Sequence, residues 1–406
     1  MGVAPALTVS VPAPPEAPES PQSGLNNEQW NWSGLPVSAG VVVLEAGDGR
    51  TVLIATTGNI RGWAQRRFQV PEAGQRSPRA ELRGIVRVVR ACEAGSRFEA
   101  DLAYLALARE RMASAHRAVT DRWQGWFVHV DPGAEHPKFV KAVTRSLGDD
   151  AWRTGTLIGP FSNKHAAGRA MDVLTDLFDL CRYHHLLVLS PRARACAYKE
   201  MGKCPAPCDG SETLESYRGR VEKACTLMRG GVGAAIEAAT ERMRRASIDQ
   251  DFERAAAEKR LVDGLQPLMK SGCGWARTLD VFSLCGVAQG GDARTARVFA
   301  IGAGGVERIA DVAVEAEIGA WEDAARRCRE CSEQLQRGFD WGEESLDTLG
   351  LVCDRLYTPR STTRFGGVEF AWCDQGLSGE VVRSLAQRVL GREDADEGDG
   401  LEVGLE

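Results

Sequence analysis

The chain has 406 residues, of which 43% are hydrophobic and 26% are charged, and its formal net charge is -6. This length allows two or three domains with separate cores, and the negative charge excludes a general attraction to nucleic acid, although a local basic face is still possible. No run of about 18 apolar residues is present and the N-terminus lacks a basic, apolar leader, so we expect a cytoplasmic protein without membrane contact.

Residues 1–35 are predicted to form a disordered tail, because the first part is rich in Pro, Ala and Ser and shows no periodicity. Two β-branched runs then flank "GDG" in "AGVVVLEAGDGRTVLIATT", a pattern typical of a β-hairpin. A helix is expected over "NIRGWAQRRF". After a third strand, a second helix begins with Ser96 as its cap and Glu99 completing a capping box. Residues 36–120 are therefore predicted to be a small α+β domain.

The rest of the chain alternates further strands and helices, so the fold class expected for the whole is α+β. We interpret residues 121–211, with short strand-like pieces, a helix and several cysteines, as a linker. Residues 212–270 have the apolar spacing of amphipathic helices and predict an antiparallel helical hairpin. Residues 271–390 return to a strand pattern followed by a helix, which indicates an α/β unit, and residues 391–406 form an acidic tail.

Four of the twelve cysteines are grouped ahead of the predicted hairpin, at Cys181, Cys196, Cys204 and Cys208. In a cytoplasmic protein, cysteines more often bind metals, act in catalysis or fill the core than form disulfides. The segment "GKCPAPCDG" is too polar and too rich in Pro and Gly for a core, which favours metal binding. The spacing suits either a zinc site or a cuboidal iron-sulfur cluster, and ordinary buried cysteines remain an alternative.

The sequence around these cysteines resembles the middle of the UvrC family, which comprises the incision subunit of the bacterial UvrABC excinuclease and its shorter Cho-like relatives. The resemblance runs through "LIGPFSNKHAAGRAMDVLTDLFDLC" and "CAYKEMGKCPAPCDGSETLESYRGRVEKACTLMRGG". The positions that match the family's motifs are Gly159 to Phe161, Leu177, Phe178, Cys196, Tyr198, Gly202, Cys204 and Cys208. The resemblance implies that the last three cysteines, together with Cys181, hold a four-iron four-sulfur (4Fe-4S) cluster, with zinc as the alternative.

A second resemblance lies in "ERMRRASIDQDFERAAAEKRLVDGL", which is similar to the UVR motif, a helical hairpin through which UvrC proteins meet UvrB. It implies that Phe252, Glu253 and Ala256 contact a UvrB-type partner, although a plain surface hairpin would show a similar pattern. From residue 275 the strands resemble the opening of the family's RNase H-like half. We expect that domain to be partial, without the second incision centre or helix-hairpin-helix DNA-binding motifs.

The first domain occupies the position of the GIY-YIG nuclease in the UvrC family. The resemblance puts Val42 and Leu53 at two tyrosines of the motif and Trp63 at the helix arginine. Only Glu99 keeps a catalytic residue type, that of the metal-binding carboxylate. Phosphodiester hydrolysis needs a proton acceptor, a cation for the charge on phosphate and a metal ion such as Mg²⁺. Because Val42, Leu53 and Trp63 supply neither of the first two, we expect a degenerate site.

The helix after the predicted β-hairpin is basic and contains an indole, a combination that suits DNA. Arginines pair with phosphate oxygens, and an indole ring stacks on bases. The candidate DNA-binding residues are Arg61, Trp63, Arg66 and Arg67.

Three functions are compatible with these observations. The first is a UvrC-like protein of nucleotide excision repair that binds DNA or a UvrB-type partner without cutting. The second is a divergent but active GIY-YIG endonuclease that incises damaged DNA. The third is an iron-sulfur protein with a structural or interaction role unrelated to repair. A partner-binding test separates the first from the third, and an incision assay separates the first from the second.

Overall fold

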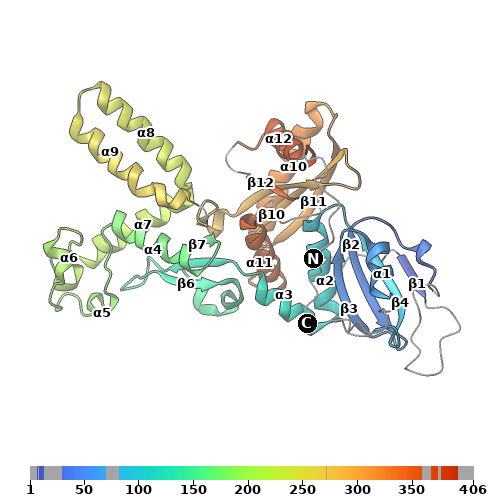
Figure 1. The fold of residues 1–406 in the computed structure, drawn as a ribbon. Helices are drawn as coiled ribbons and strands as arrows, with labels where there is room; N and C mark the ends of the chain where they lie inside the picture. Colours follow the sequence, from blue (N-terminus) through green and yellow to red (C-terminus); the bar gives the residue numbers. More distant parts are fainter. Residues whose placement is uncertain are drawn as a thin grey trace.

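The computed structural model describes residues 7, 9–12, 30–69, 82–270, 272–358, 367–373 and 376–391. Within these ranges the strands form three four-stranded antiparallel sheets, which we call the N-terminal, middle and C-terminal units together with the helices around them (Figure 1). The mixture of helices and antiparallel sheets confirms the predicted α+β class. No helix in the described ranges is long and apolar enough to cross a membrane. The predicted acidic tail lies outside them, apart from Gly391.

The N-terminal unit is a sheet with one helix on each face, and its strand order is β1-β4-β2-β3. Alternate residues of the central strand point to opposite sides, so Val42 and Leu44 pack under α1 whereas Val41 and Val43 pack under α2. The elements are β1 (Val9–Pro12), β2 (Gly40–Ala46), β3 (Thr51–Thr57), α1 (Ile60–Arg67), β4 (Val86–Glu93) and α2 (Arg97–Arg111).

Local sequence signals explain these elements. The predicted hairpin around "GDG" is the antiparallel pair β2–β3, and Gly49 at its turn has φ 81°, a conformation that favours glycine. The side chain of Asn59 caps α1 by accepting from the backbone N–H of Gly62. Ser96 caps α2 as expected, because its side chain accepts from the N–H of Glu99.

The prediction of disorder over residues 1–35 is wrong for the parts of that tail that the structure describes. Residues 9–12 form β1, which extends the sheet by pairing with β4, and Val11 is buried. Trp30 and Trp32 stack on each other with ring centroids 5.2 Å apart, and both contact Phe68. A four-residue strand and two tryptophans are too short to produce a recognisable hydrophobic periodicity in a sequence rich in proline.

The middle unit contains a sheet of order β6-β5-β7-β8, with α4 packed on it through small residues such as Ala166 and Ala170. Residues 121–211 therefore contribute most of a folded unit, not the linker that the sequence suggested. Its last strand, β8, comes from much later in the chain. The elements are α3 (Ala113–Arg122), β5 (Trp126–Val130), β6 (Val140–Val143), β7 (Thr156–Phe161), α4 (Lys164–Leu177), α5 (His184–Leu187), α6 (Ala197–Glu200) and β8 (Arg277–Thr278).

Three helices occupy the region of the predicted hairpin, α7 (Leu214–Gly230), α8 (Val232–Ile248) and α9 (Phe252–Leu265). The first of them, α7, packs on the middle unit, so the hairpin itself consists only of α8 and α9 and is shorter than predicted. Gly231, with φ 86°, separates α7 from α8. The two hairpin helices project from the body of the protein (Figure 1).

The C-terminal unit has the strand order β11-β10-β9-β12, with α10 and α12 on one face and α11 towards the other. Its likeness to an RNase H fold stays a prediction. The elements are β9 (Ser283–Gln289), β10 (Thr295–Gly302), β11 (Gly305–Ala313), α10 (Ile318–Arg337), α11 (Glu343–Tyr357), β12 (Glu369–Trp372) and α12 (Gly379–Leu390). Short 3-10 helices, η2 to η7, cover Trp32–Gly34, Thr144–Gly148, Asp150–Trp152, Pro207–Asp209, Gln266–Met269 and Leu279–Val281.

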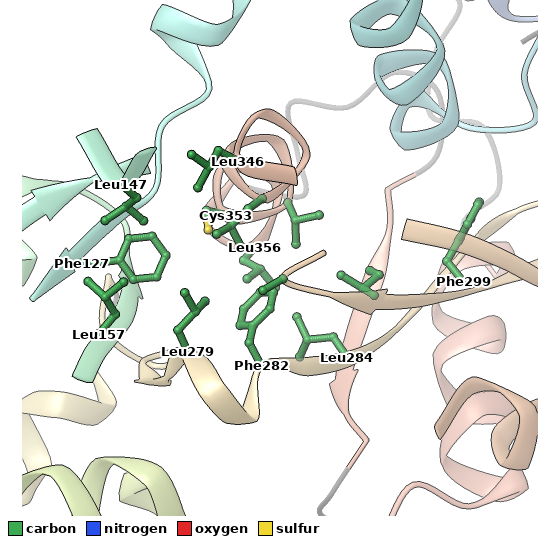
Figure 2. Close-up of a cluster of buried hydrophobic side chains, with 14 of the residues drawn as sticks. Phe127, Leu147, Leu157, Leu279, Phe282, Leu284, Phe299, Leu346, Cys353 and Leu356 are labelled. Carbon is green, nitrogen blue, oxygen red and sulfur yellow. The ribbon is translucent and has the colours of Figure 1, made fainter. Parts of the chain in front are cut away.

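Helix α11 joins the three units through one hydrophobic cluster (Figure 2). Figure 2 shows Leu346, Cys353 and Leu356 of α11 facing side chains of the middle and C-terminal units. The backbone comes very close here, since a Cβ at Gly350 would lie 2.5 Å from the carbonyl oxygen of Trp123. The facing side chains are Phe127, Leu147 and Leu157 from the middle unit, Leu279 and Phe282 from the segment after β8, and Leu284 and Phe299 from the C-terminal sheet.

A buried ion pair reinforces the contact between α2 and α11. The Asp101 carboxylate, only 1% exposed, lies 2.8 Å from Arg97 and 2.9 Å from Arg355. Burial raises the pKa of Asp101, while the two guanidinium groups act in the opposite direction. Arg355 also lies over the ring of Trp123 at the end of α3.

We expect Asp101→Ala to lower the free energy of unfolding of this junction by about 3–5 kcal/mol, because it leaves two arginines without their shared buried partner. Urea unfolding followed by tryptophan fluorescence measures the change. The control is Glu333→Ala, which removes the partner of Arg337 in an exposed pair on α10 and should leave the transition unchanged. Equal transitions for Asp101→Ala and the wild type would contradict this account of the junction.

Candidate functional site

The four cysteines singled out in the sequence lie in one irregular segment, residues 178–213, which we call the cysteine loop. Hydrogen bonds rather than a large core hold it together. Ser190 donates to the carbonyl oxygen of Pro207 at 2.6 Å, and the N–H of Ala193 donates to that of Cys208 at 3.0 Å. Lys199 donates to the carboxylate of Asp209, also at 2.6 Å. These polar contacts hold residues 190–199 against residues 207–209 near the C-terminal end of the loop.

The structure brings the four thiols together. Cys181 and Cys204 each influence the pKa of the other, and the charges of Cys204 and Cys196 act on Cys208. Cys204 and Cys208 are buried, whereas Cys181 and Cys196 are half-buried. Their convergence, across 28 positions of sequence and with little secondary structure between them, indicates that the loop is arranged around the sulfur atoms.

Electrostatics favour the thiolate form of one of these cysteines. The hydrogen bond from Cys181, the backbone N–H of Ala206 and the positive charge of Arg220 together lower the pKa of Cys204 to about 6. The same interaction raises the pKa of Cys181. Because a thiolate, not a thiol, binds metal, Cys204 is prepared to act as a ligand.

The distances between the sulfur atoms help to distinguish a zinc ion from an iron-sulfur cluster as the metal group of the loop. Among the described residues, no three of these atoms lie within 4.8 Å of one another. A tetrahedral zinc ion with Zn–S bonds of about 2.3 Å would bring its sulfur ligands to within about 3.8 Å of one another. A cuboidal cluster binds each thiolate at a different iron and holds them further apart. The donor set, four cysteines, fits such a cluster.

Glu99, the predicted metal-binding carboxylate, is engaged in an ion pair between two units. Its carboxylate accepts from the N–H of Gly95 at 2.7 Å, and both oxygens contact Arg297 of β10. Arg297 also holds Asp311 through two bonds of 2.9 Å. These carboxylates raise the pKa of Arg297, the Asp311 hydrogen bond having the largest effect. Glu99 therefore has a structural role that accounts for its position.

The structure does not assemble the nuclease-like site. Val42 of the sheet and Trp63 of α1 are buried against each other's elements on one face, while Glu99 belongs to α2 on the opposite face of the sheet. The burial of Trp63 contradicts the prediction that its ring stacks on a base. Arg61 is directed inward and donates to the carbonyl oxygens of Leu35 and Ser33.

The remaining predicted DNA-binding and partner-binding residues are at the surface. Arg66 is exposed and Arg67 is half-buried at the end of α1, so a phosphate contact stays a prediction for both. Phe252, Glu253 and Ala256 are all exposed near the start of α9, at the tip of the hairpin.

Sequence reasoning missed one cluster of ionisable side chains. His116, Glu343 and Asp347 are grouped closely enough to hold a cation. However, Asp347 already pairs with His116 at 2.7 Å and with Arg109 at 2.9 Å, so the cluster is better explained as a polar contact between α2, α3 and α11. No local motif could have revealed it, because His116 is more than 220 positions away from Glu343 and Asp347 in the sequence.

Comparison with known proteins identifies a segment of the chain that contains the cysteine loop. Residues 126–227, from β5 to the last turn of α7, match the family model of the UvrC/Cho excinuclease middle domain. The chain is UvrC-like. The match contains all four cysteines of the loop, and it ends within α7, before the chain enters the projecting hairpin.

Curated relatives extend this likeness. The UvrABC system protein C of Gemmatimonas aurantiaca is 28% identical over 230 residues, which is 55% of this chain and 35% of that protein. The one from Methanococcoides burtonii is 26% identical over 213 residues, 52% of this chain and 33% of the relative. The Nitratidesulfovibrio vulgaris protein is 32% identical over 135 residues, 33% of this chain and 19% of the relative. The chain thus spans about a third of the length of these relatives or less. No solved structure matches it.

Proposed function

We propose that this protein acts in nucleotide excision repair as a UvrC-like binding protein, which meets a UvrB-type partner and DNA without cutting the DNA itself. The observation that carries the proposal is the match of residues 126–227 to the UvrC/Cho middle domain, which contains the converging cysteines. An iron-sulfur protein unrelated to repair would have no reason to match in this way. Repair of DNA also fits the cytoplasmic location expected from the sequence.

The α8–α9 hairpin is the proposed contact with the UvrB-type partner. Arg242 of α8 holds Glu258 of α9 through bonds of 2.8 and 2.9 Å, which fixes the two helices against each other. At the tip, Ile248 and Phe252 are 71% and 72% exposed. Large apolar side chains on a projecting helical pair are typical of a surface that another protein covers. The resemblance to the UVR motif supports a UvrB-type partner.

The cysteine loop is the proposed site of a four-iron four-sulfur cluster, with Cys181, Cys196, Cys204 and Cys208 as ligands. The four thiols and the lowered pKa of Cys204 support metal binding, and the absence of three closely spaced sulfur atoms among the described residues favours a cluster over a zinc ion. Such a cluster would stabilise a segment that has little core of its own.

The N-terminal unit is proposed to be catalytically inactive. In the resemblance to the GIY-YIG nucleases, the positions of two phenols and an arginine fall on Val42, Leu53 and Trp63, which transfer no proton and carry no charge. In addition, Arg297 already neutralises Glu99. An active, divergent endonuclease would need other groups for all of these roles, and Arg66 is the exposed cation nearest in sequence to Trp63.

Replacing Phe252 tests the partner contact. We expect Phe252→Ser to weaken binding to a UvrB-type protein by about 2 kcal/mol, roughly thirtyfold, because it removes the central apolar anchor of the tip. Co-migration on a sizing column and calorimetric titration of the intact proteins measure binding. Val37→Ser removes an apolar side chain that is similarly exposed, in the N-terminal unit, and should bind as the wild type does. Failure of the wild type to bind, or equal binding by Phe252→Ser, would refute the hairpin contact.

Cys204→Ser should abolish the cluster, because it removes the ligand that most readily becomes a thiolate. Iron and sulfide analysis and visible absorbance of anaerobically purified protein provide the measurement. The control is Cys225→Ser, which changes a buried cysteine of the adjacent α7 outside the proposed set and should retain full iron content. One equivalent of zinc with no iron in the wild type would overturn the cluster in favour of a zinc site.

No Mg²⁺- or Mn²⁺-dependent incision of damaged duplex DNA is expected, even with the UvrB-type partner loaded. Loss of a general base alone typically slows catalysis by roughly 100- to 10,000-fold. Nicking is measured on gels beside an active GIY-YIG enzyme, and Glu99→Gln should show the same background as the wild type. Nicking by the wild type that disappears in Glu99→Gln would show that the site is active.

A further inference from the structure

A cavity of about 620 Å³ opens where the middle unit, α7 and the C-terminal unit meet. It lies apart from the cysteine loop and from the hairpin tip, and nothing proposed above uses it. Its volume is typical of a small-molecule site. Its lining combines three aromatic rings with charged and hydroxyl groups, and these come from all three of the surrounding elements.

The aromatic rings belong to Trp152, Phe339 and Trp341. Trp152 is in η4 of the middle unit, whereas Phe339 and Trp341 are in the segment between α10 and α11. The latter two rings are in contact, with centroids 4.7 Å apart. Trp341 adopts φ 60°, a left-handed conformation that is unfavourable for a bulky residue and is often found at binding sites. All three rings are only half-buried, so part of their surface is available to a ligand.

One polar group in the lining lacks a partner. Thr278 of β8 is only 2% exposed, and its hydroxyl makes no hydrogen bond to any described residue. A buried hydroxyl without a partner is unfavourable, so a ligand that supplies one gains affinity. Nearby, Glu222 and Asp280 offer carboxylate oxygens that accept hydrogen bonds.

Arg229 supplies a positive charge at the same cavity. Its side chain is 63% exposed and lies 3.0 Å from Asp280. A guanidinium at this position attracts phosphate and disfavours a cationic ligand, although the aromatic rings and carboxylates alone would accept one. The combination of stacking surface, hydrogen-bond acceptors and an exposed arginine is that of a nucleotide site.

We propose that this cavity binds an unstacked base of single-stranded DNA and prefers bases that carry an exocyclic amino group. The aromatic rings stack on the base, the carboxylates of Asp280 and Glu222 accept from its amino group, and Arg229 contacts the adjoining phosphate. Cytosine offers such a donor and thymine does not, so the site distinguishes the two. The inference rests on the proposed function in DNA repair and adds a substrate-contacting site to it.

The test is a titration of the intact protein with oligo-dC and oligo-dT of about twelve nucleotides, a length typical of single-strand sites. Quenching of tryptophan fluorescence and anisotropy of end-labelled DNA report binding. Oligo-dC should bind at least tenfold more tightly than oligo-dT. Trp341→Ala and Trp152→Ala should each weaken oligo-dC binding roughly tenfold, because each removes a stacking surface.

Asp280→Asn keeps the size of an exposed side chain and should fold normally, and it should reduce the preference for oligo-dC over oligo-dT. Phe252→Ser at the hairpin tip should bind both oligonucleotides as the wild type does. Equal affinities of the wild type for the two oligonucleotides, no binding of either, or an unchanged preference in Asp280→Asn would each overturn the inference. Binding of Trp341→Ala to the UvrB-type protein separates the two proposals, since loss of the base site leaves that interaction intact.

Discussion

The packing of α11 against three units is the constraint on which the rest of the structure depends. Its apolar face meets the middle sheet, the first strands of the C-terminal sheet and α2, so a single helix fixes how these parts are oriented. The close approach at Gly350 leaves no room for a side chain larger than hydrogen. Polar contacts then surround the apolar centre, with Asp101 between two arginines on one side and Asp347 between Arg109 and His116 on another. The aromatic cavity and the ion pair of Glu99 both lie where these fixed units meet.

Much of the local structure could be predicted from the sequence, because the signals are short-range. The turn at Gly49 and the cap at Ser96 depend on neighbouring residues, and the structure confirms both. The helical character of residues 212–270 was equally evident from the spacing of apolar side chains. What periodicity could not show is which helices pair, and α7 packs on the middle unit instead of joining the hairpin. The grouping of the four cysteines was also foreseeable, since their segment is too polar to form a core.

Contacts between distant parts of the chain could not be predicted in this way. Glu99 resembles a catalytic carboxylate when only its own helix is considered, but its ion pair is with Arg297, almost 200 positions later. Trp63 resembles a surface residue of a basic helix, yet the packing of α1 on the N-terminal sheet buries it. β8 is only two residues long, so its sequence does not predict a strand. It is recognised as one only through its pairing with β7. In each case tertiary packing, which depends on the whole fold, decides the role of a residue that local patterns leave undetermined.

The pairing of β7 with β8 also has a consequence for the architecture of the protein. Ile158 lies opposite Thr278, although the chain between them contains the cysteine loop and the projecting hairpin. That whole stretch is therefore an excursion that leaves the sheet and returns to the neighbouring strand. Because its two ends are close together, its length could change without forcing the sheet to open, and the entropy of closing it rises only slowly with the number of residues. The middle unit can thus accommodate an insertion of variable length between the adjacent strands β7 and β8.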